Sequence, residues 1–315
     1  MSEAPEALGE LPRVSDLLEE YKDAIAAVRS QPEVAPLLGA EHDELFFLRY
    51  CISFRDVAKS ATAIKQAIEW RRENVDVLSR IDDLQAEVKK IIPTGMLPWR
   101  TNQGQPIQVA IPFAVDVSTW ATKSEEWHHE AGISNREVAY RICDQLTRET
   151  GRLVKLVMIQ DLTGLSLQFA MQNSQLVKNQ GKLSKLSEFL FPQLIATVVV
   201  THPPSFIATL YKGFSPLLSE RLIKKVKMAE NVDKLCKYAA LPNDRVPTFL
   251  GGTYEWDAEW VPLRVKAKDN GGASSNGPPV PHGAPALGTT KSGGSVGSPS
   301  QSRLAFSFNP FGSSK

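Results

Sequence analysis

Residues 153–164 read LVKLVMIQDLTG and carry the pattern on which the fold prediction rests. The run from Leu153 to Ile159 is almost continuously apolar, as expected of a strand that is covered on both faces. A turn signal follows at Asp161–Gly164. A second run of this kind covers residues 195–200. Two fully buried strands in one chain predict a sheet with helices on both sides.

The segments around these two runs alternate between strand and helix patterns. Alternating apolar residues over 107–117 and a short run over 225–229 predict two more strands. Helical spacing predicts helices over 134–150, about 166–177, 182–190, 203–218 and 232–239. This order predicts the α/β class, with a mixed, mostly parallel sheet covered by helices.

The chain before residue 96 has helical patterns throughout. They cover about 14–28, 41–52, a segment that starts after Asp56, and 84–92, where Pro93 and Gly95 stop the helix. Half of the residues from 266 to 315 are Gly, Ser or Pro, so this tail is predicted to be disordered. We therefore predict an N-terminal tail (1–12), a small helical cap (13–95), a sheet domain (96–258) and a disordered tail (266–315).

Composition excludes several classes of protein. The 36 Lys and Arg residues nearly balance the 35 Asp and Glu residues, so no basic field points to nucleic acid. Cys51, Cys143 and Cys236 lie far apart, which argues against a zinc or redox site and for free thiols in a reducing compartment. The first residues lack a signal-peptide pattern, and the longest apolar run is too short to cross a bilayer. We predict a soluble, cytoplasmic protein.

Signatures of catalysis are weak. The chain has no phosphate-binding Walker loop and no Gly-x-Gly-x-x-Gly motif. His128 and His129 are adjacent and point about 100° apart on a helix, so we interpret them as a solvated helix start and predict no metal site. His202 and Asp161 each follow a predicted strand, which suggests a site at one edge of the sheet. We assign them no catalytic role and predict that the protein is not an enzyme.

Four stretches occur in the order found in one known family. They are FFLRY at 46–50 with a helix ending in WRR at 70–72, then GQPI at 104–107, VMIQDLTG at 157–164 and VPTFLGG at 246–252. In this order they resemble the CRAL-TRIO family, of the yeast phosphatidylinositol/phosphatidylcholine transfer protein type. The resemblance covers roughly residues 43–255. It implies a hydrophobic lipid pocket in the domain at 96–258 and no cofactor apart from the bound lipid.

Carrying a lipid requires an apolar cavity and a wall that opens. Lifting two acyl chains into water costs on the order of 20 kcal/mol, at about 0.8 kcal/mol per CH₂ group. The resemblance identifies residues 203–218 as a gate helix, with hinge positions at Pro203, Pro204 and Gly213. Spacing alone would equally fit an ordinary amphipathic helix packed on a core. The predicted lining residues are Val157, Ile159 and Val198 from the strands and Phe206, Leu210, Tyr211 and Phe214 from the gate.

Two residues are candidate contacts for a lipid head group. Phosphatidylinositol binders of the family carry a Glu at the position of Gln193, and a Lys at the position of Lys225. Leu222 stands where these relatives have a Thr, and their Arg falls near Cys51 or Ile52. The ligand therefore stays open between a phospholipid and a sterol-like or isoprenoid lipid. Lys225 also fits a solvated edge strand protected by lysines.

The motif Asn309-Pro310-Phe311 in the tail is similar to the NPF ligand of EH domains, so we predict a possible EH-domain partner in membrane traffic. We predict a monomeric, peripherally membrane-associated protein that holds one amphiphilic lipid and exchanges it at membranes. The alternative is a lipid sensor without transfer activity, or a traffic scaffold that acts through the tail.

Overall fold

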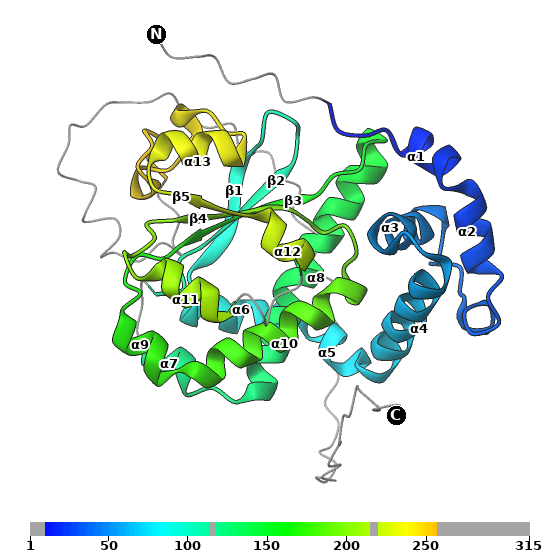
Figure 1. Ribbon diagram of the computed structural model, residues 1–315, viewed down its shortest axis with the longest axis horizontal. Helices are drawn as coiled ribbons and strands as arrows, with labels where there is room; N and C mark the ends of the chain where they lie inside the picture. Colours follow the sequence, from blue (N-terminus) through cyan, green and yellow to red (C-terminus); the bar gives the residue numbers. More distant parts are fainter. Residues whose placement is uncertain (1–9, 114–116, 215–219, 257–315) are drawn as a thin grey trace, which may run out of the picture. The chain divides into compact units, whose positions relative to one another are not determined.

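A five-stranded sheet lies at the centre of the fold, with its strands in the order β1-β2-β3-β4-β5 (Figure 1). β1 (Thr94–Arg100) pairs antiparallel with β2 (Pro106–Ala110). β3 (Leu156–Asp161), β4 (Ile195–Thr201) and β5 (Val226–Ala229) continue the sheet in parallel. The predicted mixed, mostly parallel sheet is confirmed. β1 was not predicted, since Pro98 and the absence of clear alternation hide it in the sequence.

This computed structural model describes residues 10–113, 117–214 and 220–256. All of them belong to the first of the two units into which the chain divides, Met1–Gly272. The predicted disordered tail and the motif Asn309–Phe311 lie outside the described residues.

Short helices form the N-terminal part of this unit. Asp43 and Asp56 cap two of them, because their carboxylates accept hydrogen bonds from the backbone N–H groups of Phe46 and Lys59. The predicted helix over 14–28 is divided at Tyr21. The helices are α1 (Val14–Glu20), α2 (Lys22–Arg29), the 3₁₀ turn η1 (Ala35–Leu37), α3 (Glu44–Phe54), α4 (Val57–Glu73), α5 (Val75–Ser79) and α6 (Ile81–Ile91).

Further helices alternate with the strands of the sheet. They are α7 (Val117–Ala121), α8 (Glu125–Thr150), α9 (Leu167–Gln172), α10 (Ser174–Leu190), α11 (Ile207–Phe214), α12 (Glu220–Lys225) and α13 (Val232–Ala239), with 3₁₀ turns η3 (Asn243–Arg245) and η4 (Thr248–Leu250). α8 begins at Glu125, well before the predicted start, because the Ser124 hydroxyl caps it there. α10 joins the end of the helix predicted over 166–177 to the helix predicted over 182–190, and α9 forms most of the first segment. Lys225 ends α12 and does not belong to a strand.

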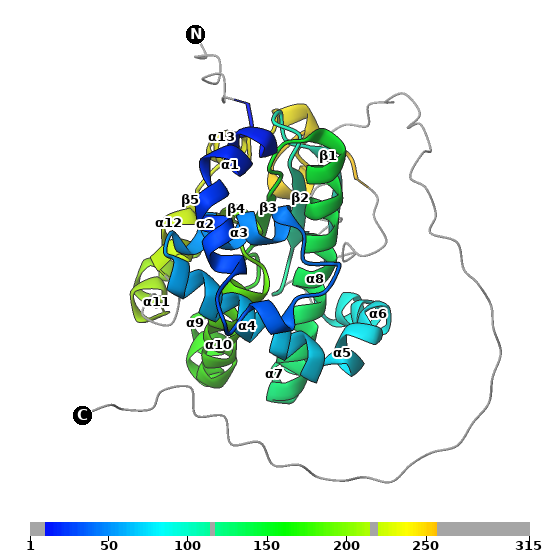
Figure 2. The same cartoon turned by 90° about the vertical axis from the view of Figure 1, so that its right-hand side faces the viewer.

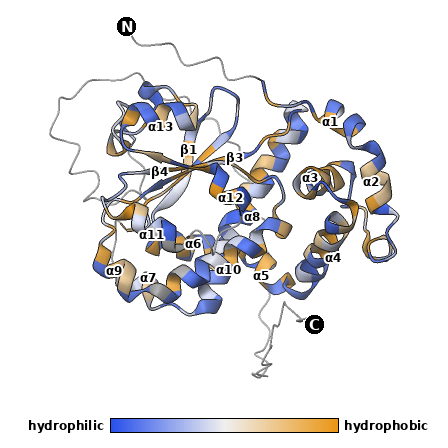
Figure 3. Ribbon diagram, viewed as in Figure 1, coloured by the Kyte–Doolittle hydropathy of each residue, from blue (hydrophilic) through white to orange (hydrophobic). Residues whose placement is uncertain are grey.

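The two faces of the sheet have different environments. α13 packs on one face, while α8, α10 and α11 lie on the other side (Figure 1). The central strands are coloured mainly as hydrophobic in Figure 3. Because successive side chains of a strand point to opposite faces, β3 sends Val157 and Ile159 toward α13, and Leu156 and Met158 toward α8 and α10.

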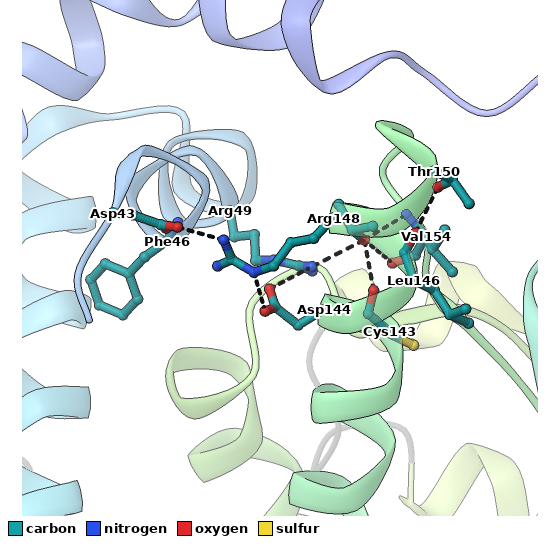
Figure 4. A network of polar contacts seen from close by, with 10 residues as sticks. Asp43, Phe46, Arg49, Cys143, Asp144, Leu146, Arg148, Thr150 and Val154 are labelled. Atoms are coloured by element: carbon teal, nitrogen blue, oxygen red, sulfur yellow. Dashed lines mark hydrogen bonds and ion pairs between the residues drawn. The ribbon is translucent and has the colours of Figure 1, made fainter. Parts of the chain in front are cut away.

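A polar network, buried at Arg49 and exposed at Arg148, joins the N-terminal helices to α8 (Figure 4). Arg49 of α3 is fully buried, and its Nη2 donates to Asp144 Oδ1 and Thr147 Oγ1, both at 3.3 Å. Arg148 donates to Asp144 Oδ2 at 2.7 Å and to Asp43 Oδ2 at 2.6 Å. One hydrophobic core cluster also contains residues of α2, α3, α4, α8, α10 and β3. The helical cap is therefore packed into the core of the sheet domain.

Candidate lipid-binding site

The sheet face toward α8, α10 and α11 is the candidate binding surface. The strand register places two rows of side chains across it. The rows are Met158–Val198–Val226 and Gln160–Val200–Met228. Val198 and Val200 are buried, but Met158, Gln160, Val226 and Met228 are only half-buried. On this face the side chains of the internal strand β4 are buried, while those of β3 and of the edge strand β5 keep accessible surface that a ligand could cover. Under α13, by contrast, Val157, Ile159 and Val199 are all buried.

The structure separates the three predicted strand residues. Val198 lies in one of these rows. Val157 and Ile159 lie on the opposite face, in the cluster that packs with α13. The sequence pattern could not show this, since both faces of β3 are apolar.

The predicted gate corresponds to α11 and the residues just before it. Phe206 and Tyr211 are half-buried, whereas the side chains of Leu210 and Phe214 lie outside the described part of the structure. His202 has a φ of 47° and precedes Pro203 and Pro204, so the chain turns sharply between β4 and α11.

The C-terminal ends of β3 and β4 are joined at this turn. His202 Nδ1 lies 2.8 Å from Asp161 Oδ1, and Asp161 Oδ1 also accepts from the N–H and hydroxyl of Thr163. The predicted pair of polar residues at one sheet edge is therefore present. The contact joins the chain just after β4, where it leads to α11, to the end of β3.

Gln193 and Lys225 both lie at the opposite edge, near the start of β4. Lys225 Nζ donates to the carbonyl oxygen of Ile195 at 2.5 Å. Gln193 has a φ of 61°, and its Nε2 donates to Ser53 Oγ of α3 at 2.9 Å. Burial lowers the pKa of Lys225, and Arg221 adds to this effect.

Sequence reasoning missed two charged residues at this edge. Lys155 directly precedes β3, and burial, then Lys225 and Arg49, lower its pKa to about 8. It makes no hydrogen bond or ion pair with the described residues. Glu188 Oε1 is also buried without a hydrogen-bond partner among them. A signal was present, since Lys155 interrupts an otherwise apolar run and lysine is seldom buried.

A family model described as the CRAL/TRIO domain matches residues 94–252, half of the chain. The chain belongs to the CRAL/TRIO domain family. This is a family of lipid-binding and lipid-transfer proteins, whose members generally bind lipids and are not enzymes. The matched CRAL/TRIO segment begins with β1 and contains the whole sheet.

Two other comparisons add little to the CRAL/TRIO match. The chain is similar to the crystal structure of Sfh5, with 12% sequence identity and a TM-score of 0.43, over 71% of this chain and 83% of that chain. No curated protein matches the chain. None of the helices in the described ranges is both long and apolar enough to span a membrane.

The vicinal histidines of the CRAL/TRIO domain are not solvated as predicted. His128 is buried, with its ring centroid 6.2 Å from that of Trp120 and 5.5 Å from that of Trp127. Burial lowers the pKa of both histidines. His128 is internal because Trp120 of α7 and Trp127 pack against its ring, although Glu125 and Glu126 at the start of α8 are exposed. The sequence pattern does not reveal this packing. Within the described residues, no group of three or more His, Cys, Asp or Glu side chains could hold a metal ion.

Proposed function

We propose that this CRAL/TRIO protein holds one amphiphilic lipid, a phospholipid, with its acyl part against the two rows of side chains on β3, β4 and β5. The observation that carries the proposal is the difference between the two sheet faces. The face under α13 forms a closed core, whereas the other leaves Met158, Val226 and Met228 partly accessible beneath helices. Apolar surface left uncovered inside a domain is stabilised by an apolar ligand.

The exchange step is assigned to α11. The helix follows the turn at His202–Pro204, and both Phe206, just before it, and Tyr211 within it are half-buried. A segment with few fully buried side chains opens at lower free-energy cost than the core does. Gln193 and Lys225, which the sequence identifies as candidate head-group contacts, form a polar edge of the site at the start of β4.

α9 supplies an apolar surface for contact with a membrane. Among the described residues, the exposed large hydrophobic side chains are Val75, Leu167 and Met171. Leu167 and Met171 are four residues apart on α9, so they share one helix face. α9 lies beside α11 in both views (Figures 1 and 2). Phe169 holds α9 from the inside, with its ring centroid 5.7 Å from that of Phe113.

These features favour a monomeric carrier that works in the cytoplasm and touches membranes transiently. The buried thiols Cys51 and Cys143 are free, which fits a reducing compartment. The motif Asn309–Phe311 is a separate proposal for an EH-domain partner. An alanine at Phe311 is expected to abolish binding to an isolated EH domain, and unchanged binding would remove the proposal.

Native mass spectrometry with lipid extraction, on protein from a eukaryotic host, tests the proposal. One phospholipid per chain is the expected result. The double variant Leu210→Asp with Phe214→Asp should stay folded and lose transfer between vesicles. Normal transfer by this variant would overturn the assignment of the gate. A chain that stays empty after incubation with mixed vesicles would contradict lipid carriage and favour a scaffold acting through the tail.

A further inference from the structure

Arg136, near the middle of α8, has no carboxylate partner among the described residues. Its only hydrogen bond within them runs from Nη1 to the carbonyl oxygen of Gly132, in its own helix, at 3.0 Å. Other arginines of the same helix are paired: Arg141 with Glu137 at 2.9 Å and Arg148 with Asp144 at 2.7 Å. Arg136 therefore has donors to spare.

The neighbours of Arg136 show which way this part of α8 faces. The adjacent Asn135 accepts a hydrogen bond from Gln108 Nε2 of β2 at 2.8 Å. One turn earlier, Gly132 lies against α10, since a methyl group there would come within 2.0 Å of Leu183 Cδ2. At about 100° per residue, Arg136 lies about 40° from Gly132 and about 100° from Asn135 around the axis of α8, so it is on the side of α10. α10 covers the side of the sheet on which the two half-buried rows lie (Figure 1).

The environment of Arg136 is unfavourable for a lone cation. Burial lowers the pKa of Arg136 to about 10, and no acidic group opposes the effect. The residue as a whole is half-buried, so part of it keeps accessible surface that a ligand could contact. An unpaired cation away from bulk water destabilises the fold until an anion neutralises it. The planar guanidinium fork fits a carboxylate or phosphate with two parallel hydrogen bonds.

Two more polar side chains on this side of the sheet lack good partners. His129 lies seven residues earlier, on the same face of α8, and its Nε2 is buried without a hydrogen-bond partner among the described residues. Gln160, in the second row of the sheet, donates from Nε2 to the Met158 sulfur at 3.5 Å, and a thioether is a weak acceptor. Lys225, by comparison, already has a carbonyl partner.

Building on the proposed lipid site, we propose that Arg136, supported by His129 and Gln160, binds the oxyanion of the lipid head group. The ligand class is therefore an acidic amphiphile, with a carboxylate or phosphate at Arg136 and its hydrocarbon chain along the strand rows. A neutral lipid of the same length leaves the guanidinium unpaired.

The test compares a C16 fatty acid with the fatty alcohol of equal length, on lipid-free protein at pH 7.5. Hydrogen bonds to a charged group predict that the wild type binds the acid roughly tenfold to a hundredfold more tightly. Arg136→Gln should lose this preference and keep its affinity for the alcohol. Arg141→Gln, on the same helix, is the matched control and should keep the preference. Arg136→Lys keeps the charge but not the planar guanidinium, so it should keep part of the preference for the acid. This variant replaces Arg136→Gln in the test if the glutamine variant does not fold.

Each outcome has a distinct meaning. An equal affinity of the wild type for acid and alcohol overturns the inference and leaves the lipid site standing. A preference for the acid that is unchanged in Arg136→Gln also overturns the inference. If neither C16 ligand binds, this inference fails, whereas the proposed function is decided separately by the phospholipid that native mass spectrometry finds. Phosphatidic acid and inorganic phosphate separate the sources of the anion. Binding of phosphatidic acid that depends on Arg136 supports the inference, whereas inorganic phosphate binding as tightly as the lipids would make this a site for soluble anions and overturn it.

Discussion

Asp144→Ala is expected to destabilise the protein by leaving a buried cation without its carboxylate. The Arg49 side chain is 0% exposed, and its Nε and Nη1 have no hydrogen-bond partner among the described residues. After the change, Arg49 would keep the Thr147 hydroxyl at 3.3 Å and the ring of Tyr140, whose centroid is 5.1 Å away. Neither neutralises the charge.

The magnitude follows from the geometry of the pair. Removing one partner of a buried ion pair costs about 3–5 kcal/mol. The Arg49–Asp144 contact is long, at 3.3 Å, and the Asp144 side chain is 29% exposed, so we expect the lower end, about 3 kcal/mol. Arg49→Met removes the cation and fills the site with an apolar chain, while Asp144 keeps Arg148. This change should cost about 1 kcal/mol or less.

Urea unfolding of the lipid-free protein at pH 7 measures these differences. The double variant of Arg49→Met and Asp144→Ala should unfold close to Arg49→Met alone, because the loss caused by Asp144→Ala depends on the cation. Arg148→Ala, which removes exposed ion pairs, is the control and should cost less than about 1 kcal/mol. The reasoning is refuted if Arg49→Met costs as much as Asp144→Ala, or if the two losses simply add.

Three other outcomes are expected. The folded pKa of Lys155, about 8, lies below its unfolded value of 10.5, so the unfolded state binds more protons between these pH values and stability rises with pH there. Lys155→Met should therefore unfold at higher urea than the lipid-free wild type at pH 7, by a margin that shrinks toward pH 10; a constant margin would contradict this. Leu167→Ser with Met171→Ser should weaken sedimentation with vesicles about tenfold or more, since two apolar side chains are lost from the membrane contact. Val75→Ser, equally exposed but on α5, should leave vesicle binding unchanged, and equal losses would remove α9 from the membrane surface. Gly132→Ala should lower the free energy of unfolding by about 1–3 kcal/mol through overpacking, measured by thermal unfolding; an unchanged midpoint would show that α10 can retreat.

The sequence alone determined the class of the fold and most of its elements. Continuous apolar runs identified β3 and β4 because strands buried on both faces need no polar positions. The helical spacing at 232–239 matches α13. Short motifs in a set order also pointed to the CRAL/TRIO family, and the family match confirms it. These signals are local, so they survive without knowledge of distant contacts.

Only the tertiary structure decided which residues share a site. Alternation along β3 shows that Val157 and Met158 face opposite ways, but not which face α13 closes and which remains open. The sequence does not show that Gln193 contacts Ser53, 140 residues away. Nor does it show that Arg136 has no carboxylate partner among the described residues. Burial and pairing depend on how distant segments of the chain pack together. For this reason the sequence contains no sign that Arg136, His129 and Gln160 are candidates for ligand binding.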